Sequence, residues 1–242
     1  PFAKVAGNGI KKLVESGKNV IVGILEDECN ELNKRFFTFH QKKRPFIILK
    51  WAETADGFIA PISKEEKIPV WITNPYSRQL VHKWRTEEQA ILVGTNTVLD
   101  DNPKLDARYF SGNNPIRIVL DKSGKISENY HVKNNSQKTI FITESENFIS
   151  TENCIYENAI FDIHLISSIC DILYKNDIQS VIIEGGSKTL QSFIDANLWD
   201  EARVFKGDTT FQNGILAPNI SGNPVAGFDI MNDELKIFKN YD

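Results

Sequence analysis

The stretch 90–105 (AILVGTNTVLDDNPKL) constrains the fold most, because it contains a complete transition from a strand to a helix. Its apolar run over 91–93 is bounded by turn residues, which is typical of a buried strand in a parallel sheet. A turn begins at Gly94, and a short helix is expected over 97–101 before Pro103 ends it. The stretch therefore indicates one strand–turn–helix unit of an α/β protein.

Two carboxylates, Asp100 and Asp101, lie at the carboxyl end of that expected helix. The helix dipole disfavours negative charge there by about a few tenths of a kcal/mol per group, so helix propensity does not account for them. Such conflicts tend to mark functional positions. A solvated acidic turn is the other interpretation, and the sequence leaves both open.

Composition describes an ordinary soluble globular chain, with 41% hydrophobic and 25% charged residues among 242. The net charge is −4 and the basic residues are scattered, so no nucleic-acid partner is expected. No apolar run approaches the length of a membrane span, and no membrane partner is expected. An anionic substrate would need a local cluster of basic side chains.

The three cysteines, Cys29, Cys154 and Cys170, are widely spaced and form no Cys-x-x-Cys pair. No cluster of histidines and cysteines has the spacing of zinc ligands, so no metal site is expected. An odd number of cysteines fits a reducing, cytoplasmic location.

Residues 1–43 are expected to form a helix over 4–16, a strand over 19–23 and a second helix over 26–40. Such a unit is too small to bury its apolar faces alone, so it must pack on something else. The charged junction 41–45 contains a proline and is the best linker candidate.

Beyond the junction, strand and helix patterns alternate. Asn74 and Pro75 form a helix-start signal. The expected elements are strands over 45–54, 115–121, 138–143, 201–207 and 234–240 and helices over 73–88 and 164–175. The last two strands alternate polar and apolar residues and suit a half-exposed sheet edge or hairpin. The expected fold is α/β, with a central, mostly parallel sheet, flanking helices and an antiparallel C-terminal edge.

The segment 180–194 is a second strand–turn–helix unit. Its apolar strand ends at Glu184, Gly185 and Gly186 form the turn, and Ser187 begins the helix. A helix amino terminus beside a glycine turn offers N–H groups to phosphate. A plain tight turn remains the alternative, because a glycine pair alone is a weak signal.

Lys50, the Gly94 turn, Asp101 and Glu184 all fall at the carboxyl ends of expected strands, where open α/β sheets bind ligands. If these strands are neighbours, the four positions share one cleft. The cations available to hold an anionic group there are Arg85 and Arg108. Arg85 has a second interpretation, as a surface partner of Glu88.

Four motifs follow one another in order: LKWAETADGFIA, WITN, HKWRTEEQAILVGTNTVLDDNPKLDAR and VIIEGGSKTL. Together they resemble the reductase domain of the bifunctional riboflavin-biosynthesis deaminase/reductase family. The resemblance covers 44–242, whereas 1–43 resemble the end of that family's deaminase domain. The zinc motifs of the deaminase, His-Ala-Glu and Pro-Cys-x-x-Cys, are not in this sequence.

The resemblance implies a dihydrofolate-reductase-like fold, a homodimer, and reduction of 5-amino-6-(5-phosphoribosylamino)uracil by NADPH to the ribitylamino product. By position it implies substrate contacts for Arg85, Leu105, Arg108 and Glu184. It implies cofactor contacts for Trp71, Thr97, Asp101, Lys122, Gly186, Ser187, Lys188, Thr189 and Leu190. Lys50 matches a lysine near the reacting ribose. Lys50, Asp101 and Glu184 are therefore the catalytic candidates, with the proton assigned to either Lys50 or Asp101.

Three positions depart from the family's common pattern. The usual Ala-Ser-Leu-Asp-Gly is Glu53 to Gly57 here, and Pro69 replaces a common substrate-side serine. Lys122 stands where a cofactor-contacting serine is common, and it offers a cation for the 2′-phosphate of NADPH.

Other functions stay open at this point. A different NADPH reductase of the same fold would keep the cofactor residues but not both arginines. A folate reductase is disfavoured, since a phosphate clamp has no role there. A non-catalytic scaffold of a deaminase would bind cofactor without turnover.

Overall fold

The structure is a computed structural model, which describes residues 7–63 and 70–241. The first residues of the helix expected over 4–16, and Pro69, lie outside the described residues. No helix in the described part of the chain is long and apolar enough to cross a membrane.

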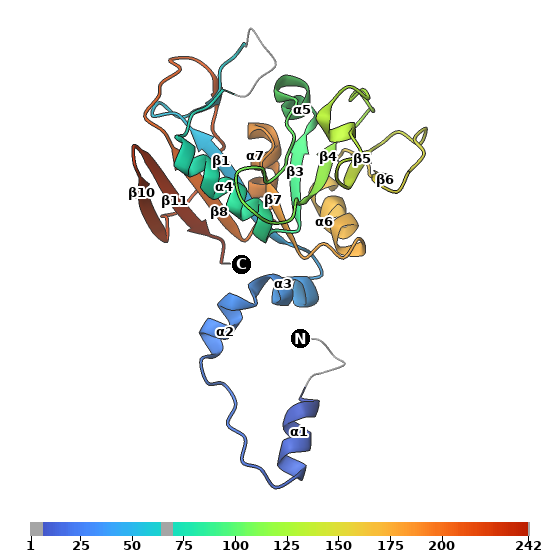
Figure 1. The fold of residues 1–242 in the computed structure, drawn as a ribbon, viewed down its shortest axis with the longest axis vertical. Helices are drawn as coiled ribbons and strands as arrows, with labels where there is room; N and C mark the ends of the chain where they lie inside the picture. Colours follow the sequence, from blue (N-terminus) through green and yellow to red (C-terminus); the bar gives the residue numbers. More distant parts are fainter. Residues whose placement is uncertain (1–6, 64–69, 242) are drawn as a thin grey trace.

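A nine-stranded sheet organises the described residues, in the order β10-β11-β8-β1-β7-β3-β4-β5-β6 (Figure 1). Its strands are β1 (Phe46–Glu53), β3 (Ala90–Gly94), β4 (Ile116–Leu120), β5 (Thr139–Thr143), β6 (Cys154–Asn158), β7 (Ser180–Ile183), β8 (Glu201–Lys206), β10 (Ala226–Ile230) and β11 (Asp233–Lys239). Neighbours from β8 through β6 pair in parallel, whereas β10 and β11 pair antiparallel. The predicted mostly parallel sheet with an antiparallel C-terminal edge is confirmed.

Helices cover both faces of this sheet, because alternate residues of its strands point to opposite sides. They are α4 (Pro75–Glu87), α5 (Thr95–Asp101), α6 (Leu165–Lys175) and α7 (Ser187–Asp195), with a short 3-10 helix, η1 (His131–Lys133). Side chains of α6 and α7 share one core cluster with Ile47 and Leu49. Those of α4 pack with Ile48 on the opposite face, where Val98 of α5 joins a third cluster.

The helix-start signal before α4 is confirmed. Asn74 caps this helix, because its side-chain oxygen accepts from the backbone N–H groups of Tyr76 and Ser77 at 2.9 and 3.1 Å. Pro75 occupies the first helical position, where a missing N–H costs nothing.

The N-terminal expectations were partly wrong. Residues 19–23 form no strand, and Ile21 and Val22 are exposed because no other strand lies beside them. The helix expected over 26–40 is broken at Asn33 into α2 (Glu26–Leu32) and α3 (Lys34–Lys42). Figure 1 shows α1 (Asn8–Glu15) and α2 away from the sheet, with α3 beside it.

The prediction of a half-exposed β8 was also wrong. Residues 201–205 are buried, because β8 lies between β1 and β11 instead of at an edge. The edge strand on this side is β10, and β6 forms the other edge. The sequence analysis missed both, together with the small pair β2 (Phe58–Ala60) and β9 (Ile215–Leu216). These missed strands are short, between two and five residues, and none of their residues is buried.

Candidate active site

Two glycine turns meet at the carboxyl ends of β3 and β7. A Cβ on Gly185 would lie 2.5 Å from the backbone nitrogen of Gly94, which no side chain permits. The Gly186 N–H donates to Thr97 Oγ1 at 3.0 Å, and a Cβ on Gly94 would lie 2.8 Å from Thr189 Oγ1. The helices α5 and α7 therefore begin side by side, as the sequence predicted for strands that are neighbours.

The predicted cofactor residues on α7 differ in how they are placed. Ser187, Lys188 and Thr189 form the first turn, where helix N–H groups have no acceptor inside the helix. Leu190 is 1% exposed in the core, and its N–H donates to the Gly186 carbonyl at 3.2 Å. Any ligand at this turn would meet the first three residues, whereas Leu190 anchors the helix.

Trp71 and Lys122, two further predicted cofactor residues, lie at the surface. Trp71 is half exposed, and the Arg78 guanidinium lies 4.5 Å from its ring centroid. Lys122 follows β4 and pairs with Glu144 at 3.5 Å. Both side chains are exposed, so neither belongs to the buried centre of the site.

A buried ion pair occupies that centre. Arg85 donates to Glu184 through Nε at 3.1 Å and Nη2 at 2.7 Å, and through Nη1 to the Asp106 carbonyl at 3.0 Å. The interpretation of Arg85 as a partner of Glu88 was wrong, because Glu88 accepts from Arg35 instead. Helix α4 directs Arg85 across the sheet to the end of β7.

Lys50 extends this pair into a three-charge cluster. Lys50 projects from β1 on the side where Phe205 lies, and its Nζ is 5.9 Å from the centroid of the Phe205 ring. Burial lowers the pKa of Lys50, and Arg85 adds to this while Glu184 opposes it. Burial acts to raise the pKa of Glu184, but Arg85 and Lys50 outweigh it and lower that pKa to about 2. Glu184 is thus an anion held between two cationic side chains.

Arg108 lies at the rim of the cluster. Its side chain is 35% exposed, against 12% for Arg85, and its Nη1 contacts the Asp106 carboxylate. Its guanidinium lies 4.9 Å from the ring centroid of Tyr109. The two predicted phosphate ligands therefore meet at Asp106, and Arg108 is the more accessible of them.

Asp101 and Leu105 flank a tight turn beside the cluster. Asp101 is the last residue of α5, and Asn102 after it has a left-handed backbone with φ 42°. Leu105 is 3% exposed with φ 54°, so its side chain packs into the core. Any contact from Leu105 to a ligand would come from its backbone.

His82 is a member of this site that the sequence analysis missed. It is 4% exposed, its ring lies 4.7 Å from that of Tyr109, and its Nδ1 has no hydrogen-bond partner. Burial, with Arg85 and Arg108, lowers its pKa to about 4. The signal available in the sequence was spacing, since residues three apart on a helix share a face.

Acidification is expected to destabilise the protein through His82. Between its usual pKa of 6.5 and its folded-state pKa of about 4, the unfolded chain binds a proton that the folded chain does not. The free energy of unfolding should therefore fall as pH falls through this window, by at most about 3 kcal/mol. Urea unfolding of the wild type and of His82→Gln at several pH values between 6.5 and about 4 measures this change in the free energy of unfolding. Equal pH slopes for the two proteins would contradict the assignment.

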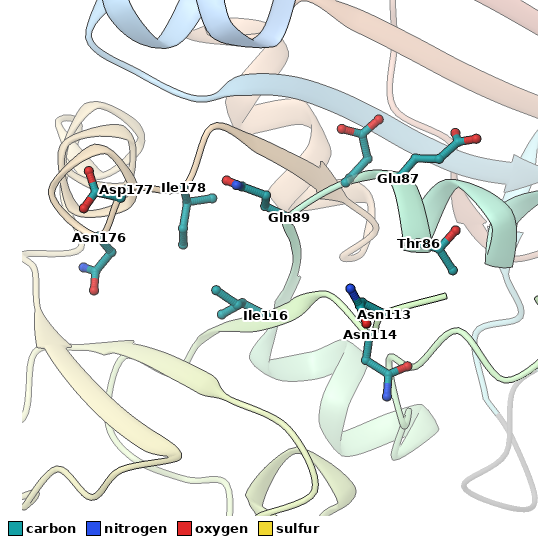
Figure 2. Close-up of a pocket in the computed structure, with 10 residues that line it drawn as sticks. Thr86, Glu87, Gln89, Asn113, Asn114, Ile116, Asn176, Asp177 and Ile178 are labelled. Atoms are coloured by element: carbon teal, nitrogen blue, oxygen red, sulfur yellow. The ribbon is translucent and has the colours of Figure 1, made fainter. Parts of the chain in front are cut away.

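No group of three or more histidine, cysteine or acidic side chains that could hold a metal ion occurs within residues 7–63 and 70–241. A separate pocket of about 310 Å³ lies at the opposite end of the parallel strands (Figure 2). It is lined by residues that precede β3 and β4, among them Gln89 and Asn114. None of the predicted site residues contributes to it.

Comparison with known proteins identifies relatives of this chain. Residues 45–209 match the family model of the RibD C-terminal domain. The riboflavin biosynthesis protein RibD of Aquifex aeolicus is 34% identical over 99% of this chain and 66% of its own length. That of Bacillus amyloliquefaciens is 32% identical over 96% and 63%. The chain thus spans less than two thirds of these relatives.

Solved structures agree with this result. The diaminohydroxyphosphoribosylaminopyrimidine deaminase/5-amino-6-(5-phosphoribosylamino)uracil reductase of Thermotoga maritima is 34% identical, with a TM-score of 0.84 over 99% of this chain and 69% of its own. The yeast riboflavin biosynthesis reductase Rib7, 19% identical, has a TM-score of 0.66 over 86% of this chain and 99% of its own, and shows a shared fold.

Proposed function

The chain belongs to the RibD C-terminal domain family, and on this premise we propose that it reduces 5-amino-6-(5-phosphoribosylamino)uracil to 5-amino-6-(5-phosphoribitylamino)uracil with NADPH. The observation that carries the proposal is the buried cluster of Lys50, Arg85 and Glu184, which lies beside paired glycine turns and has Arg108 at its rim. A cytoplasmic location is part of this proposal.

The residues at the paired turns fit a nicotinamide dinucleotide. The first turn of α7 presents N–H groups and the positive end of a helix dipole, which suit a pyrophosphate. Gly186 leaves the approach open, because a Cβ there would meet only Thr97 Oγ1 at 3.5 Å. NADPH, when bound, supplies the hydride. Thr97, Asp101, Lys188 and Thr189 are the residues we assign to holding it, with Lys122 toward the 2′-phosphate.

On the substrate side, we assign the ribose phosphate to Arg108 and Arg85. The Arg108 side chain is 35% exposed, so its guanidinium can reach a phosphate, whereas Arg85 is held in place by Glu184. Lys50 lies at the buried end of the cluster, where its lowered pKa suits proton transfer to the opened ribosylamine. Asp101 is the alternative proton donor. The electrostatic interactions of Lys50 with Glu184 and Arg85 favour Lys50.

The Arg108 assignment has a kinetic test. Arg108→Ala should raise the substrate KM by about tenfold to a hundredfold, because a charge-assisted contact contributes roughly 1.5–3 kcal/mol. Arg108→Lys should restore only part of it, since lysine lacks the planar fork. The decrease in NADPH absorbance during turnover of the purified substrate gives the substrate KM of both variants. The same assay with NADH tests the preference for NADPH.

Lys83→Ala is the matched control, because Lys83 is an exposed cation on α4 paired only with Glu87 among the described contacts. It should leave the substrate KM unchanged. If the wild type shows no substrate-dependent oxidation of NADPH, the proposed reaction itself is refuted. An unchanged KM in Arg108→Ala would refute the phosphate assignment alone.

We propose further that residues 1–43 are the tail of a deaminase domain and that 44–242 are the reductase domain. Apolar side chains between 10 and 32, including Leu13, Ile21 and Leu32, are exposed, whereas Phe39 of α3 packs against Tyr174. Exposed apolar side chains of this kind fit a surface that another domain covers.

A homodimer is the expected assembly. The edge strand β10 leaves backbone groups unpaired and Phe228 exposed, next to an apolar groove of about 480 Å³ between α4 and β11. Pairing of two such edges would remove an aggregation hazard. Light scattering at micromolar concentration should give twice the 27.5 kDa chain mass. A monomer mass would contradict the dimer.

A further inference from the structure

A fully buried arginine lies outside the proposed contact residues. Arg117 is the second residue of β4, is 0% exposed, and forms no salt bridge with the described residues. Burial lowers its pKa to about 10, and the charge of Asp106 opposes this shift. A buried cation without a salt bridge is costly, so the groups that solvate it should be important for the structure.

The partners of Arg117 all belong to one loop, 131–137. Its Nη1 donates to the His131 carbonyl at 2.5 Å, and its Nη2 donates to the carbonyls of Asn134 and Gln137 at 3.2 and 3.0 Å. The side chains of Asn134 and Ser136 also accept from Nη2, at 3.0 and 3.3 Å. One guanidinium thus fixes both ends of the loop.

The same loop holds a second segment, the turn 102–105. The His131 N–H donates to Asn102 Oδ1 at 2.8 Å, and Gln137 Nε2 donates to the Leu105 carbonyl at 3.2 Å. Gln137 is itself fixed by a second bond, to the Pro115 carbonyl at 3.0 Å. Both ends of the turn therefore depend on residues that Arg117 orders.

This turn needs outside support. Asn102 and Leu105 both have positive φ, 42° and 54°, a region that side-chain-bearing residues rarely adopt. Such conformations persist where surrounding contacts determine them. The hydrogen bonds from His131 and Gln137 are contacts of this kind.

The turn also connects the two halves of the proposed site. Asp101, assigned to the cofactor, precedes it, and Asp106 follows it with the contacts to Arg85 and Arg108. A shift of the turn would move the proposed phosphate-binding side relative to α5. Misplacement by about 1 Å can cost about a hundredfold in rate.

We propose that Arg117 is a positioning residue: through loop 131–137 it sets the distance between the cofactor-binding and substrate-binding halves of the site. This inference rests on the proposed reductase function. Arg117 itself is not among the residues assigned to the substrate or to NADPH.

The most selective test uses Asn102. Asn102→Gly keeps the left-handed backbone but removes the acceptor for the His131 N–H, whereas Asn102→Asp keeps the acceptor and tolerates the same φ. Asn102→Gly should raise the substrate KM and lower kcat, each by about tenfold, with the NADPH KM within about twofold. Asn102→Asp should stay near wild type.

Arg117→Met removes the guanidinium that holds loop 131–137 and so tests Arg117 directly. Arg44→Met is its control, because Arg44 is also buried but pairs with Asp200 and makes no hydrogen bond to loop 131–137 or to the turn 102–105 among the described contacts. Both variants should lose stability. Only Arg117→Met should change the substrate KM at a temperature where both remain folded.

Hydrogen exchange separates this proposal from the reductase function. Peptides covering 102–108 should exchange faster in Asn102→Gly and, if it folds, in Arg117→Met, but not in Asn102→Asp or Arg44→Met. If the wild type lacks the proposed activity, the reductase function fails while exchange still decides the positioning role. Unchanged exchange together with an unchanged substrate KM in Asn102→Gly would overturn the positioning role.

Discussion

Lys50→Met is expected to lower kcat by about a hundredfold to ten-thousandfold, the range that general acid catalysis contributes. The residue lies in the buried cluster with Arg85 and Glu184, and burial lowers the pKa of its amine. A lowered pKa eases release of the proton to the substrate. NADPH binding should change little, because Lys50 lies on β1, whereas the assigned cofactor residues follow β3, β4 and β7.

The pH profile distinguishes a proton donor from a fixed charge. A protonated Lys50 is lost as pH rises through its pKa, so kcat should fall at a pH below the usual lysine value of 10.5. Lys50→Arg keeps the charge and should abolish this fall, with kcat still low. Lys236→Met, which removes an exposed lysine paired with Glu234, is the control. Wild-type kcat in Lys50→Met would exclude Lys50 and leave Asp101 as the donor.

Arg35→Ala is expected to lower the free energy of unfolding by about 3 kcal/mol, the lower end of the cost of breaking a buried ion pair. The side chain of Glu88 is 0% exposed and accepts from both Nε and Nη2 of Arg35. Without Arg35, the cation that still pairs with Glu88 among the described residues is Arg203, at 3.9 Å. We use the lower end of the range for buried ion pairs because the Arg35 side chain is 30% exposed.

Urea denaturation measures this loss, and two further variants define its origin. Arg35→Ala combined with Glu88→Leu should recover most of the stability, since the buried charge is gone. Lys11→Ala removes a cation from an exposed pair with Glu15 and should change stability by less than about 0.5 kcal/mol. A loss below about 1 kcal/mol in Arg35→Ala would show that Glu88 is satisfied without α3.

Sequence patterns were sufficient for the elements that carry the site. The apolar run before Gly94, the glycine pair after Glu184 and the cap before Pro75 all lie where they were predicted. Each depends on residues within a few positions of one another, because backbone preferences and side-chain periodicity act locally. The expected convergence of these turns also followed from one rule about the carboxyl ends of parallel strands.

The sequence by itself therefore determined the strand–turn–helix units and, through its motifs, the family. Only the tertiary structure decided which charges meet: Arg85 pairs with Glu184, 99 positions away, and not with the neighbouring Glu88. It also decided that β8 is buried and that the pKa of His82 is lowered, because both depend on the segments packed against them. Burial and ion pairing are set by which distant segments come together, and local periodicity carries no record of that choice.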